Sequence, residues 1–386
     1  MAFSVHQLPV LHYGQQALKL LPNVVAPYGQ RILIVSDPVM EQLGIVKQCK
    51  ALLAQANVVC YTGVTSEPTD LFVEEGLALC MQHSRDVIVS IGGGSCIDTA
   101  KAIAVVATNG GSIHQYVHRQ KLATSAPLPH IAIPTTAGTG SEATDVTVIT
   151  DTTHHIKMMI KQPAFLPNVA IVDPLLTLSS PPHITAATGI DALSHAIEAY
   201  LSKRAHPYSD TLALSAMQLI TKHLVQAYTT DDLAAREAMA LGATQGGAAF
   251  SNASVALVHG MSRPIGALFH VPHGISNAML LPLVLEYSKD ACLPRLATIG
   301  RFFEHDPSSS NDTLAQLAID SIKMLCRQLH ITNLREYGIP ETDFLAALDK
   351  MAEDALASGS PQNNPKVPTF DELKLLYQQA FDYSFY

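Results

Sequence analysis

The first half of the chain alternates short runs of β-branched and other apolar residues with longer segments that have the periodicity of helices. Buried strands are predicted at residues 31–36, 58–61, 86–91, 130–134 and 169–172. Helices are predicted between them at residues 40–55, at residues 69–83 and from the glycines after residue 91 to about residue 107. Strands interleaved with helices indicate βαβ units and a mainly parallel sheet.

Residues 143–162 have a different pattern, because apolar and polar positions alternate on both sides of a polar turn. Such alternation around a turn is typical of a β-hairpin. After Asp173 and Pro174 the pattern changes again to successive helices, and residues 234–258 are rich in Ala, Gly and Ser, which suits helices packed closely together.

The change of pattern predicts two domains. We expect an α/β domain with a mainly parallel sheet at residues 1–178 and an all-helical domain at residues 179–386. Length supports the division, because single hydrophobic cores stop growing at roughly 250–300 residues and this chain has 386.

Composition excludes several classes of partner. Apolar residues make up 48% of the chain and charged residues 15%, which is typical of a folded protein. The formal net charge of −9 argues against nucleic acid or an anionic membrane as a partner, since either needs a basic face. The chain lacks an apolar run as long as a membrane span, its first residues lack a secretory signal pattern, and its six cysteines form no CxxC pair. We therefore expect a cytoplasmic protein.

Candidate metal ligands lie in two short stretches of the predicted helical domain. Asp191 and His195 are four residues apart, so on a helix they share one face. His259 and His273 are the first and last residues of a second stretch. In it, His259 is predicted to end one helix and His273 to begin the next. Three imidazoles and one carboxylate suit a divalent metal such as iron(II), zinc or nickel, with room left for substrate.

The same residues also allow an ordinary structural interpretation. The chain has 17 histidines, most of which must be structural or exposed, and an Asp-xxx-His pair often arises by chance. The second stretch favours the metal, because it has flanking glycines and ends in Pro-His-Gly.

A glycine loop follows the third predicted strand. Gly92, Gly93, Gly94 and Ser95 precede a helix, and Ser95 with Asp98 has the spacing of a capping box. Glycines allow the backbone to approach a pyrophosphate, and the free N–H groups of a helix start favour anions. A tight turn with no ligand is an equally good interpretation of these four residues alone.

A second polar loop, residues 135–142, also follows a strand, and its hydroxyls and glycines are expected to line the same ligand site. Asp37 ends the first strand, where a carboxylate can bind an adenosine ribose and would repel a 2′-phosphate. This predicts NAD rather than NADP. The pattern departs from the usual dinucleotide fingerprint, because GxGxxG is missing and the acid precedes the glycines.

Taken together, these motifs resemble those of the iron-containing (group III) alcohol dehydrogenases nearly from end to end. The resemblance is carried by residues 92–101, 134–142, 173–174, 187–195 and 259–274. It implies a dinucleotide-binding α/β domain, an all-helical metal-binding domain and an active site in the cleft between them. It further implies NAD and iron(II), or zinc or another divalent ion, as cofactors, an alcohol or aldehyde as substrate, and a homodimer or larger homo-oligomer.

The resemblance also assigns roles by position. Asp191, His195, His259 and His273 resemble the catalytic metal ligands. The residues that resemble cofactor contacts are Asp37, Gly93, Gly94, Ser95, Asp98, Thr135, Thr136, Thr139, Val148, Lys157 and Leu176. One position departs from the family: many members have a second histidine four residues after the third ligand, and here Arg263 stands there. His270 is a candidate to replace it in proton transfer.

The resemblance implies a hydride-transfer reaction between a primary alcohol and an aldehyde. The metal acts as a Lewis acid on the alcohol or carbonyl oxygen, and the nicotinamide exchanges the hydride. Two alternatives remain at this point. One is an NAD- and metal-dependent lyase similar to the dehydroquinate synthases, which would need more basic residues in the helical half. The other is a non-catalytic protein that binds NAD or metal. The sequence leaves open which alcohol is used, in which direction, and with which metal.

Overall fold

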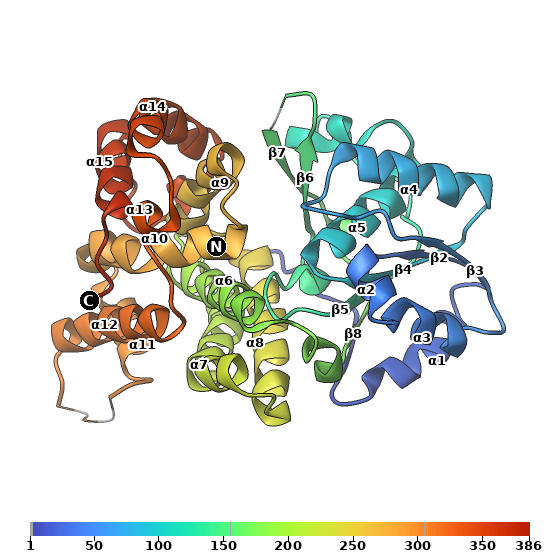
Figure 1. The fold of residues 1–386 in the computed structure, drawn as a ribbon, viewed down its shortest axis with the longest axis horizontal. Coiled ribbons are helices and arrows are strands. Elements are labelled where there is room, and N and C mark those ends of the chain that lie inside the picture. Colours follow the sequence, from blue (N-terminus) through green and yellow to red (C-terminus); the bar gives the residue numbers. More distant parts are fainter. Residues whose placement is uncertain (1–2, 155, 305, 307) are drawn as a thin grey trace. The chain divides into compact units, whose positions relative to one another are not determined.

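The computed structural model describes residues 3–154, 156–304, 306 and 308–386. It contains two compact units, one of residues Ser4–Ser180 and one of Pro181–Tyr386, to which Phe3 also belongs. The units therefore divide two residues beyond the boundary proposed from the sequence. Figure 1 shows the helices and strands of both units.

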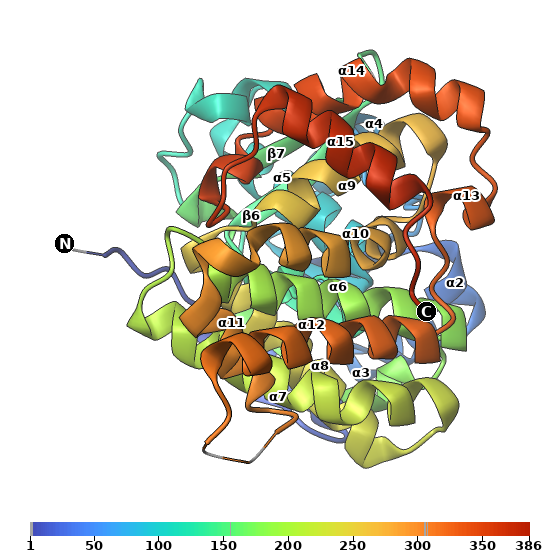
Figure 2. The same ribbon diagram turned by 90° about the vertical axis from the view of Figure 1, so that its left-hand side faces the viewer.

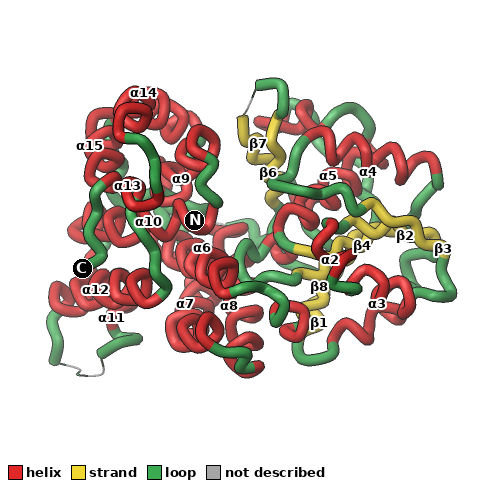
Figure 3. Tube along the Cα trace, in the orientation of Figure 1, coloured by secondary structure: helices red, strands yellow, loops and turns green. Residues whose placement is uncertain are grey.

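The described part of the first unit contains a six-stranded parallel sheet in the order β1-β8-β5-β4-β2-β3. Figure 3 shows its strands in yellow. The strands are β1 (Val10–Tyr13), β2 (Arg31–Val35), β3 (Asn57–Tyr61), β4 (Val87–Gly92), β5 (His130–Pro134) and β8 (Val169–Val172). Five of them lie where apolar runs predict strands. All residues of β4, β5 and β8 are buried, because helices cover both faces of the sheet.

Alternate side chains of β2 serve two separate hydrophobic cores. Ile32 and Ile34 pack in one core with residues of α1 (Leu21–Val25) and α3 (Ile45–Leu52). Leu33 and Val35 pack in the other with residues of α4 (Asp70–Gln82) and α5 (Gly94–Asn109). This period of two is what a continuous apolar strand requires when both faces of its sheet are covered.

Two predictions for this unit were wrong in detail. The strand β1 was missed, because it lies at the sheet edge and three of its four residues are exposed, so that it lacks a buried apolar run. The single helix predicted at residues 40–55 is two helices, α2 (Pro38–Gln42) and α3. Gly44 separates them with a φ of +78°, a left-handed conformation that glycine adopts readily and that ends an α-helix.

The hairpin predicted at residues 143–162 is confirmed as an antiparallel pair, β6 (Val146–Asp151) and β7 (Ile156–Lys161). Short 3₁₀ helices connect the elements of this unit: η1 (Ala17–Leu20), η2 (Ile113–Arg119), η3 (Ser141–Ala143), η4 (Pro163–Phe165) and η5 (Pro174–Thr177). Of these, η3 and η5 follow the central strands β5 and β8, at the carboxyl edge of the sheet where α/β proteins bind ligands.

In the described part of the second unit, every regular element is a helix (Figures 1 and 2). The α-helices are α6 (Pro182–Leu201), α7 (Pro207–Thr229), α8 (Leu233–Ala253), α9 (Leu257–Phe269), α10 (His273–Ser288), α11 (Leu293–Gly300), α12 (Asn311–Gln328), α13 (Leu334–Tyr337), α14 (Glu341–Ala357) and α15 (Phe370–Phe381). Two 3₁₀ helices, η6 (Lys289–Ala291) and η7 (Ser360–Asn363), lie among them. Among the described residues, none of the helices is long and apolar enough to span a lipid bilayer.

The helix α6 is buried along almost its whole length and packs against α7, α8, α9 and α10. Small residues allow the close contact with α8: a Cβ on Gly246 would lie 3.1 Å from the carbonyl oxygen of Ala192. The Ala- and Gly-rich stretch of the sequence therefore provides the surface of α8 that packs closely against α6. The helix α6 carries two of the candidate metal ligands, Asp191 and His195.

Candidate active site

Asp191 and His195 lie one turn apart on α6, and both are buried. His259 is the third residue of α9, and His273 is the first residue of α10. The prediction that His259 ends a helix was wrong. The preceding helix α8 already ends at Ala253, because Ser254 adopts a φ of +68°, and a new helix begins at Leu257.

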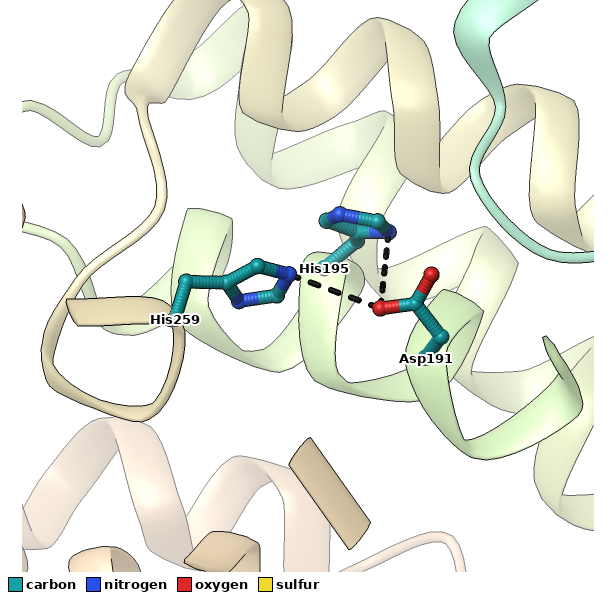
Figure 4. Close-up of side chains that lie close together, drawn as sticks. All are labelled: Asp191, His195 and His259. Atoms are coloured by element: carbon teal, nitrogen blue, oxygen red, sulfur yellow. Dashed lines mark ion pairs between the residues drawn. The ribbon is translucent and has the colours of Figure 1, made fainter. Parts of the chain in front are cut away.

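The four side chains converge on one carboxylate oxygen. Oδ1 of Asp191 lies 3.5 Å from Nε2 of His259, 3.8 Å from Nε2 of His273 and 3.9 Å from Nδ1 of His195. Figure 4 shows Asp191, His195 and His259 pointing toward one another. These distances exceed the usual 2.7–3.2 Å of a hydrogen bond. They approach the ~3.3–3.6 Å between ligand atoms around a tetrahedral ion bound at ~2.0–2.2 Å. The donor set therefore fits a divalent metal.

Ring contacts fix the orientation of the imidazoles. His195 stacks on Phe250 with 4.3 Å between ring centroids and on His259 with 4.4 Å, and His259 meets the ring of His273 edge-on at 5.2 Å. His273 is the most exposed of the four, with 31% of its side chain accessible to solvent. Ring packing thus restrains His195 and His259, and His273 is the candidate ligand with the most contact with solvent.

Glu198 supports the site and was missed by the sequence analysis. Its carboxylate is buried and accepts hydrogen bonds from Nδ1 of His259 at 2.5 Å and from the backbone N–H of Val258 at 2.6 Å. A hydrogen on Nδ1 leaves Nε2 of His259 available as a metal ligand. One signal was present in the sequence, since Glu198 lies seven residues after Asp191 and so shares its face of a largely apolar helix.

Asn277 is the second supporting residue that the sequence analysis missed. It lies one turn after His273 on α10 and is completely buried. Its amide nitrogen donates to Oδ1 of Asp191 at 2.8 Å and lies 3.2 Å from Nε2 of both His259 and His273. One amide nitrogen thus lies within 3.2 Å of three candidate ligand atoms, so these atoms adjoin one another.

The pKa directions of Asp191 and His259 also indicate that the cluster favours positive charge. Burial opposes ionisation of Asp191, but the rings of His195, His259 and His273 outweigh burial and hold the pKa of this carboxyl well below its usual range. Burial also favours the neutral ring of His259, yet Glu198 and Asp191 together raise the pKa of this ring to about 9. The cluster thus attracts positive charge, and a metal cation competes with protons for the same nitrogen.

A close helix contact brings His273 to the cluster. A Cβ on the next residue, Gly274, would lie 2.3 Å from the carbonyl oxygen of Ala187 on α6. Only glycine fits at this distance, so the start of α10 can approach α6 closely. The glycine in the Pro-His-Gly sequence therefore has a packing role beside the candidate ligand.

In the first unit, the candidate cofactor residues gather at the carboxyl ends of the central strands. From β2 the chain continues to β3 on one side, whereas β4 lies on the other side of β2. Such a switch point is where doubly wound sheets bind ligands. Asp37 follows β2 there and caps α2, because its Oδ1 accepts a hydrogen bond from the N–H of Met40 at 2.8 Å. Its Oδ2 would lie 3.1 Å from a Cβ on Gly92, at the end of β4.

The glycine loop and the threonine loop adjoin each other. The N–H of Thr135 donates to the carbonyl of Gly92 at 3.0 Å. A Cβ on Gly94 would lie 2.7 Å from the side chain of Thr139, and one on Gly93 would lie 3.5 Å from Thr136. These residues therefore form one surface at the start of α5, with backbone N–H groups available to an anion.

The capping box predicted for Ser95 and Asp98 was wrong. The helix α5 begins two residues earlier than this cap requires, with Gly93 as its N-cap and no side-chain cap, so Ser95 lies inside its first turn. Asp98 instead accepts hydrogen bonds from Oγ of Ser141 at 2.5 Å and from the N–H of Val148 at 2.8 Å. This carboxylate therefore ties the helix to the threonine loop and to the hairpin.

Two further candidate cofactor residues belong to separate elements of the first unit. Leu176 is buried in η5, directly after β8. Lys157 lies on β7, and its Nζ pairs with the carboxylate of Glu67 at 2.7 Å. An ion pair with an acid gives Lys157 a structural partner of its own, so its role toward a cofactor stays a prediction.

Family models match both units of the chain. The model described as iron-containing alcohol dehydrogenase matches residues 9–174, and the model of the C-terminal region of the Fe-containing alcohol dehydrogenase family matches residues 185–381. The chain belongs to the iron-containing alcohol dehydrogenase family. The fold predicted from the motifs is thereby confirmed, and so is the resemblance. Proteins of this family use iron and a nicotinamide dinucleotide: one relative is named an NAD-dependent methanol dehydrogenase and another an NADPH-dependent butanol dehydrogenase.

Relatives with known activities cover the chain almost completely. A 1,3-propanediol dehydrogenase of Citrobacter freundii is 39% identical over 93% of this chain and 96% of its own length. Long-chain-alcohol dehydrogenase 1 of Geobacillus thermodenitrificans is 38% identical over 97% of this chain and 95% of its own length. The solved structure of a 1,3-propanediol oxidoreductase has a TM-score of 0.94 at 37% identity and covers 99% of this chain and all of that one. This chain is accordingly an alcohol oxidoreductase that acts on small-molecule alcohols or aldehydes.

Arg263 stands four residues after His259, where the resemblance predicts a second histidine. It lies on α9, one turn after His259, and its Nη1 donates to Oγ of Ser360 in η7 at 3.0 Å. Burial lowers the pKa of its guanidinium below the ordinary value, and the nearby Glu198 opposes that shift. His270 ends α9 in a left-handed conformation and is exposed. The arginine is therefore bonded within the helical unit.

Proposed function

We propose that this chain interconverts primary alcohols and aldehydes, with NAD as the hydride carrier and a divalent ion, iron(II) in the first place, held by Asp191, His195, His259 and His273. The observation that carries the proposal is the position of Oδ1 of Asp191, which lies within 3.5–3.9 Å of a ring nitrogen of each histidine. These distances suit four ligand atoms of one ion better than hydrogen bonds.

The bound groups supply a Lewis acid for the substrate oxygen and an acceptor or donor for the hydride. The chain holds and orients them. Glu198 fixes the ring of His259 through Nδ1, and Asn277 holds Oδ1 of Asp191. Buried packing around His195 excludes water from that side of the site.

Proton transfer in this proposal does not use residue 263. A guanidinium has a pKa of about 12 or higher in water, which makes it a poor proton carrier near neutrality. Arg263 is in addition hydrogen-bonded to Ser360, so it serves structure. We propose that the alcohol proton leaves through water on the exposed side of the site, at His273.

For the cofactor, we propose that the backbone of Gly93, Gly94 and Ser95 binds the pyrophosphate at the start of α5. Thr135, Thr136 and Thr139 line the adjoining loop. Asp98, Val148, Lys157 and Leu176 complete the predicted contacts. Asp37 stands at the switch point beside Gly92, where its carboxylate favours a ribose hydroxyl over a 2′-phosphate. NAD is therefore proposed as the preferred dinucleotide.

Two expectations from the sequence stay predictions. The first is a homodimer or larger homo-oligomer, which light scattering of the purified protein tests directly. The second is the cytoplasmic location. For the substrate, relatives of almost equal identity are named for 1,3-propanediol and for long-chain alcohols, so the proposal names the class of primary alcohols.

The decisive experiment combines anaerobic purification and metal analysis with a screen of alcohols and aldehydes against NAD and NADH. We expect about one ion per chain at this site and NADH formation with primary alcohols. Retained NAD without alcohol-dependent NADH formation would favour the lyase alternative and overturn the proposal. A preparation that is active without any divalent ion would remove the role given to the four ligands.

A further inference from the structure

A lysine is buried in the middle of α5, and the function proposed above does not use it. Lys101 lies between Ala100 and Ala102, and only 1% of it is exposed to solvent. Residues 99–106 of this helix are all buried, so the pattern of α5 predicts an apolar side chain at this position. Burial of a charged group is costly unless hydrogen bonds and opposite charges compensate for it. The partners of Lys101 therefore indicate its role.

The ammonium of Lys101 is fully hydrogen-bonded. Its Nζ donates to Oγ of Ser141 at 2.8 Å, to Oγ1 of Thr144 at 2.9 Å and to the carbonyl oxygen of Val146 at 2.7 Å. These acceptors use all three of its N–H groups. Oδ1 of Asp98, one turn earlier on α5, lies 3.7 Å away. The ammonium thus joins the middle of α5 to η3 and to the first residue of β6.

The surrounding carboxylates favour a charged Lys101. Burial lowers the pKa of its ammonium to about 8. The nearby carboxylates of Asp98, Asp145 and Glu142 oppose this shift, and Asp145 and Glu142 are themselves buried. Most of the ammonium is therefore still protonated at neutral pH. Its positive charge and its hydrogen bonds both hold residues 141–146 against α5.

Ser141 connects the lysine to the threonine loop, residues 135–142. Its hydroxyl accepts from Nζ of Lys101 and donates to Oδ1 of Asp98. Its backbone N–H donates to Oγ1 of Thr139 at 3.2 Å. Thr139 in turn packs directly over Gly94, because a Cβ on this glycine would lie 2.7 Å from its side chain. A continuous set of contacts therefore leads from Lys101 to the backbone at the start of α5.

We propose that Lys101 is a positioning residue for the dinucleotide, which holds the threonine loop against the start of α5 so that both line the pyrophosphate site in a fixed geometry. This inference rests on the pyrophosphate site proposed above. Lys101 lies two turns along α5 from Gly94 and acts through Ser141 and Thr139. Supporting residues of this kind determine how precisely a binding site is held. A lysine with a purely structural role would affect stability alone, whereas a positioning lysine also affects the affinity for NAD.

The affinity for NAD of two variants of the full-length protein tests this role. Lys101→Met removes the ammonium but keeps a long side chain, and Ser141→Ala removes only the hydroxyl that links the lysine to the loop. Isothermal titration should give a Kd for NAD about 10–100-fold above that of the wild type in both, because a displaced loop no longer fits the ligand. At saturating NAD, kcat should change by less than about threefold, since the loss concerns binding rather than hydride transfer. The double variant should have a Kd close to that of Lys101→Met, because both changes break the same contact.

Ile103→Val is the matched control, because it removes a methyl group from a fully buried residue of the same helix. It should lower Tm and keep the wild-type Kd for NAD. A wild-type Kd in folded Lys101→Met overturns the proposal, and so does an equal rise of the Kd in Ile103→Val. If Lys101→Met does not fold, Ser141→Ala decides in the same way.

Gly93→Ala distinguishes failure of this inference from failure of the proposed pyrophosphate site. If Gly93→Ala raises the Kd for NAD and Lys101→Met does not, only the role of the lysine is wrong. If Gly93→Ala keeps the wild-type Kd, the pyrophosphate binds elsewhere, and the positioning role of Lys101 is wrong together with the site.

Discussion

The carboxylate of Glu198 accepts a hydrogen bond from Nδ1 of His259 at 2.5 Å, inside the helical unit. The same carboxylate accepts a hydrogen bond from the backbone N–H of Val258 at the start of α9. One buried acid thus fixes both the helix start and the ring of a metal-ligand candidate. Partners of this kind set the tautomer and basicity of the ligand that they hold.

Replacing Glu198 by glutamine should weaken metal binding while the fold is retained. The amide keeps the size of the side chain and an oxygen for the N–H groups, but it loses the charge that favours a strongly donating His259. We expect a loss of about 10–100-fold in metal affinity. Competition with a chelator measures it. Glu353→Gln, at an exposed position on α14, is the matched control and should keep wild-type affinity. Unchanged affinity in Glu198→Gln would contradict the role given to this residue.

Loss of a ligand should abolish activity without unfolding the first unit. His259→Ala and His273→Ala each remove a nitrogen from the four-donor set, and the sheet has hydrophobic cores of its own. We expect metal content near zero at this site and loss of alcohol-dependent NADH formation. Limited proteolysis and NAD binding report on the first unit. Metal content near that of the wild type in His273→Ala would remove it from the ligand set.

Asp37 should determine the choice between NAD and NADP. Unit charges ~4 Å apart interact by roughly 4 kcal/mol at an effective dielectric of 20, and solvent screening reduces this value. In Asp37→Ser we expect the kcat/KM ratio of NAD over NADP to fall at least ~10-fold. Serine is a good N-cap and so keeps the bond to the N–H of Met40. Asp37→Asn serves as a second neutral variant. Equal kcat/KM with both dinucleotides in the wild type would contradict this assignment.

The two glycines at the start of α5 provide a matched pair of variants. A Cβ on Gly93 meets the protein only at an ordinary 3.5 Å, whereas a Cβ on Gly94 meets Thr139 at 2.7 Å. If the pyrophosphate binds here, both Gly93→Ala and Gly94→Ala should raise the Kd for NAD by about tenfold or more, but only Gly94→Ala should lower Tm. Isothermal titration and thermal unfolding distinguish the two effects. A wild-type Kd in Gly93→Ala would place the pyrophosphate elsewhere.

Arg263 should contribute to stability more than to substrate recognition. Its Nη1 bonds to Ser360, so Arg263→Ala leaves a buried hydroxyl without this donor and should cost about 1–3 kcal/mol of unfolding free energy. We expect kcat/KM to change equally for a neutral alcohol and for an ω-hydroxy acid. A selective loss on the acid would instead assign Arg263 to the binding of an anionic group. A Tm equal to that of the wild type would exclude the structural role.

The parts of the fold that the sequence predicts are those with strong local patterns. The runs at residues 86–91 and 130–134 are apolar because both faces of their strands are buried. The strand Val10–Tyr13 lies at the sheet edge with most of its residues exposed, so its pattern is weak. Gly44 divides a helix through its backbone conformation, which apolar periodicity does not reveal.

In the candidate site, too, some roles follow from local spacing and others only from contacts between residues far apart in the chain. The shared helix face of Asp191 and His195 can be predicted from their spacing of four residues alone. Glu198 and Asn277 acquire their roles only through contacts between residues 61 and 86 positions apart in the chain, which no local pattern encodes. Asp98 likewise has cap-like spacing from Ser95, but its actual partners lie 43 and 50 residues further along the chain.

The ring of His195 is held between those of Phe250 and His259, so it has little freedom to follow the preferences of different ions. A rigid donor set of mixed nitrogen and oxygen atoms accepts several divalent metals, and selection among them then depends on supply. The activity of a preparation is therefore expected to depend on the metal ions in the growth medium and on exposure to air. Two preparations of one chain can differ in rate simply because different ions were available while each was made.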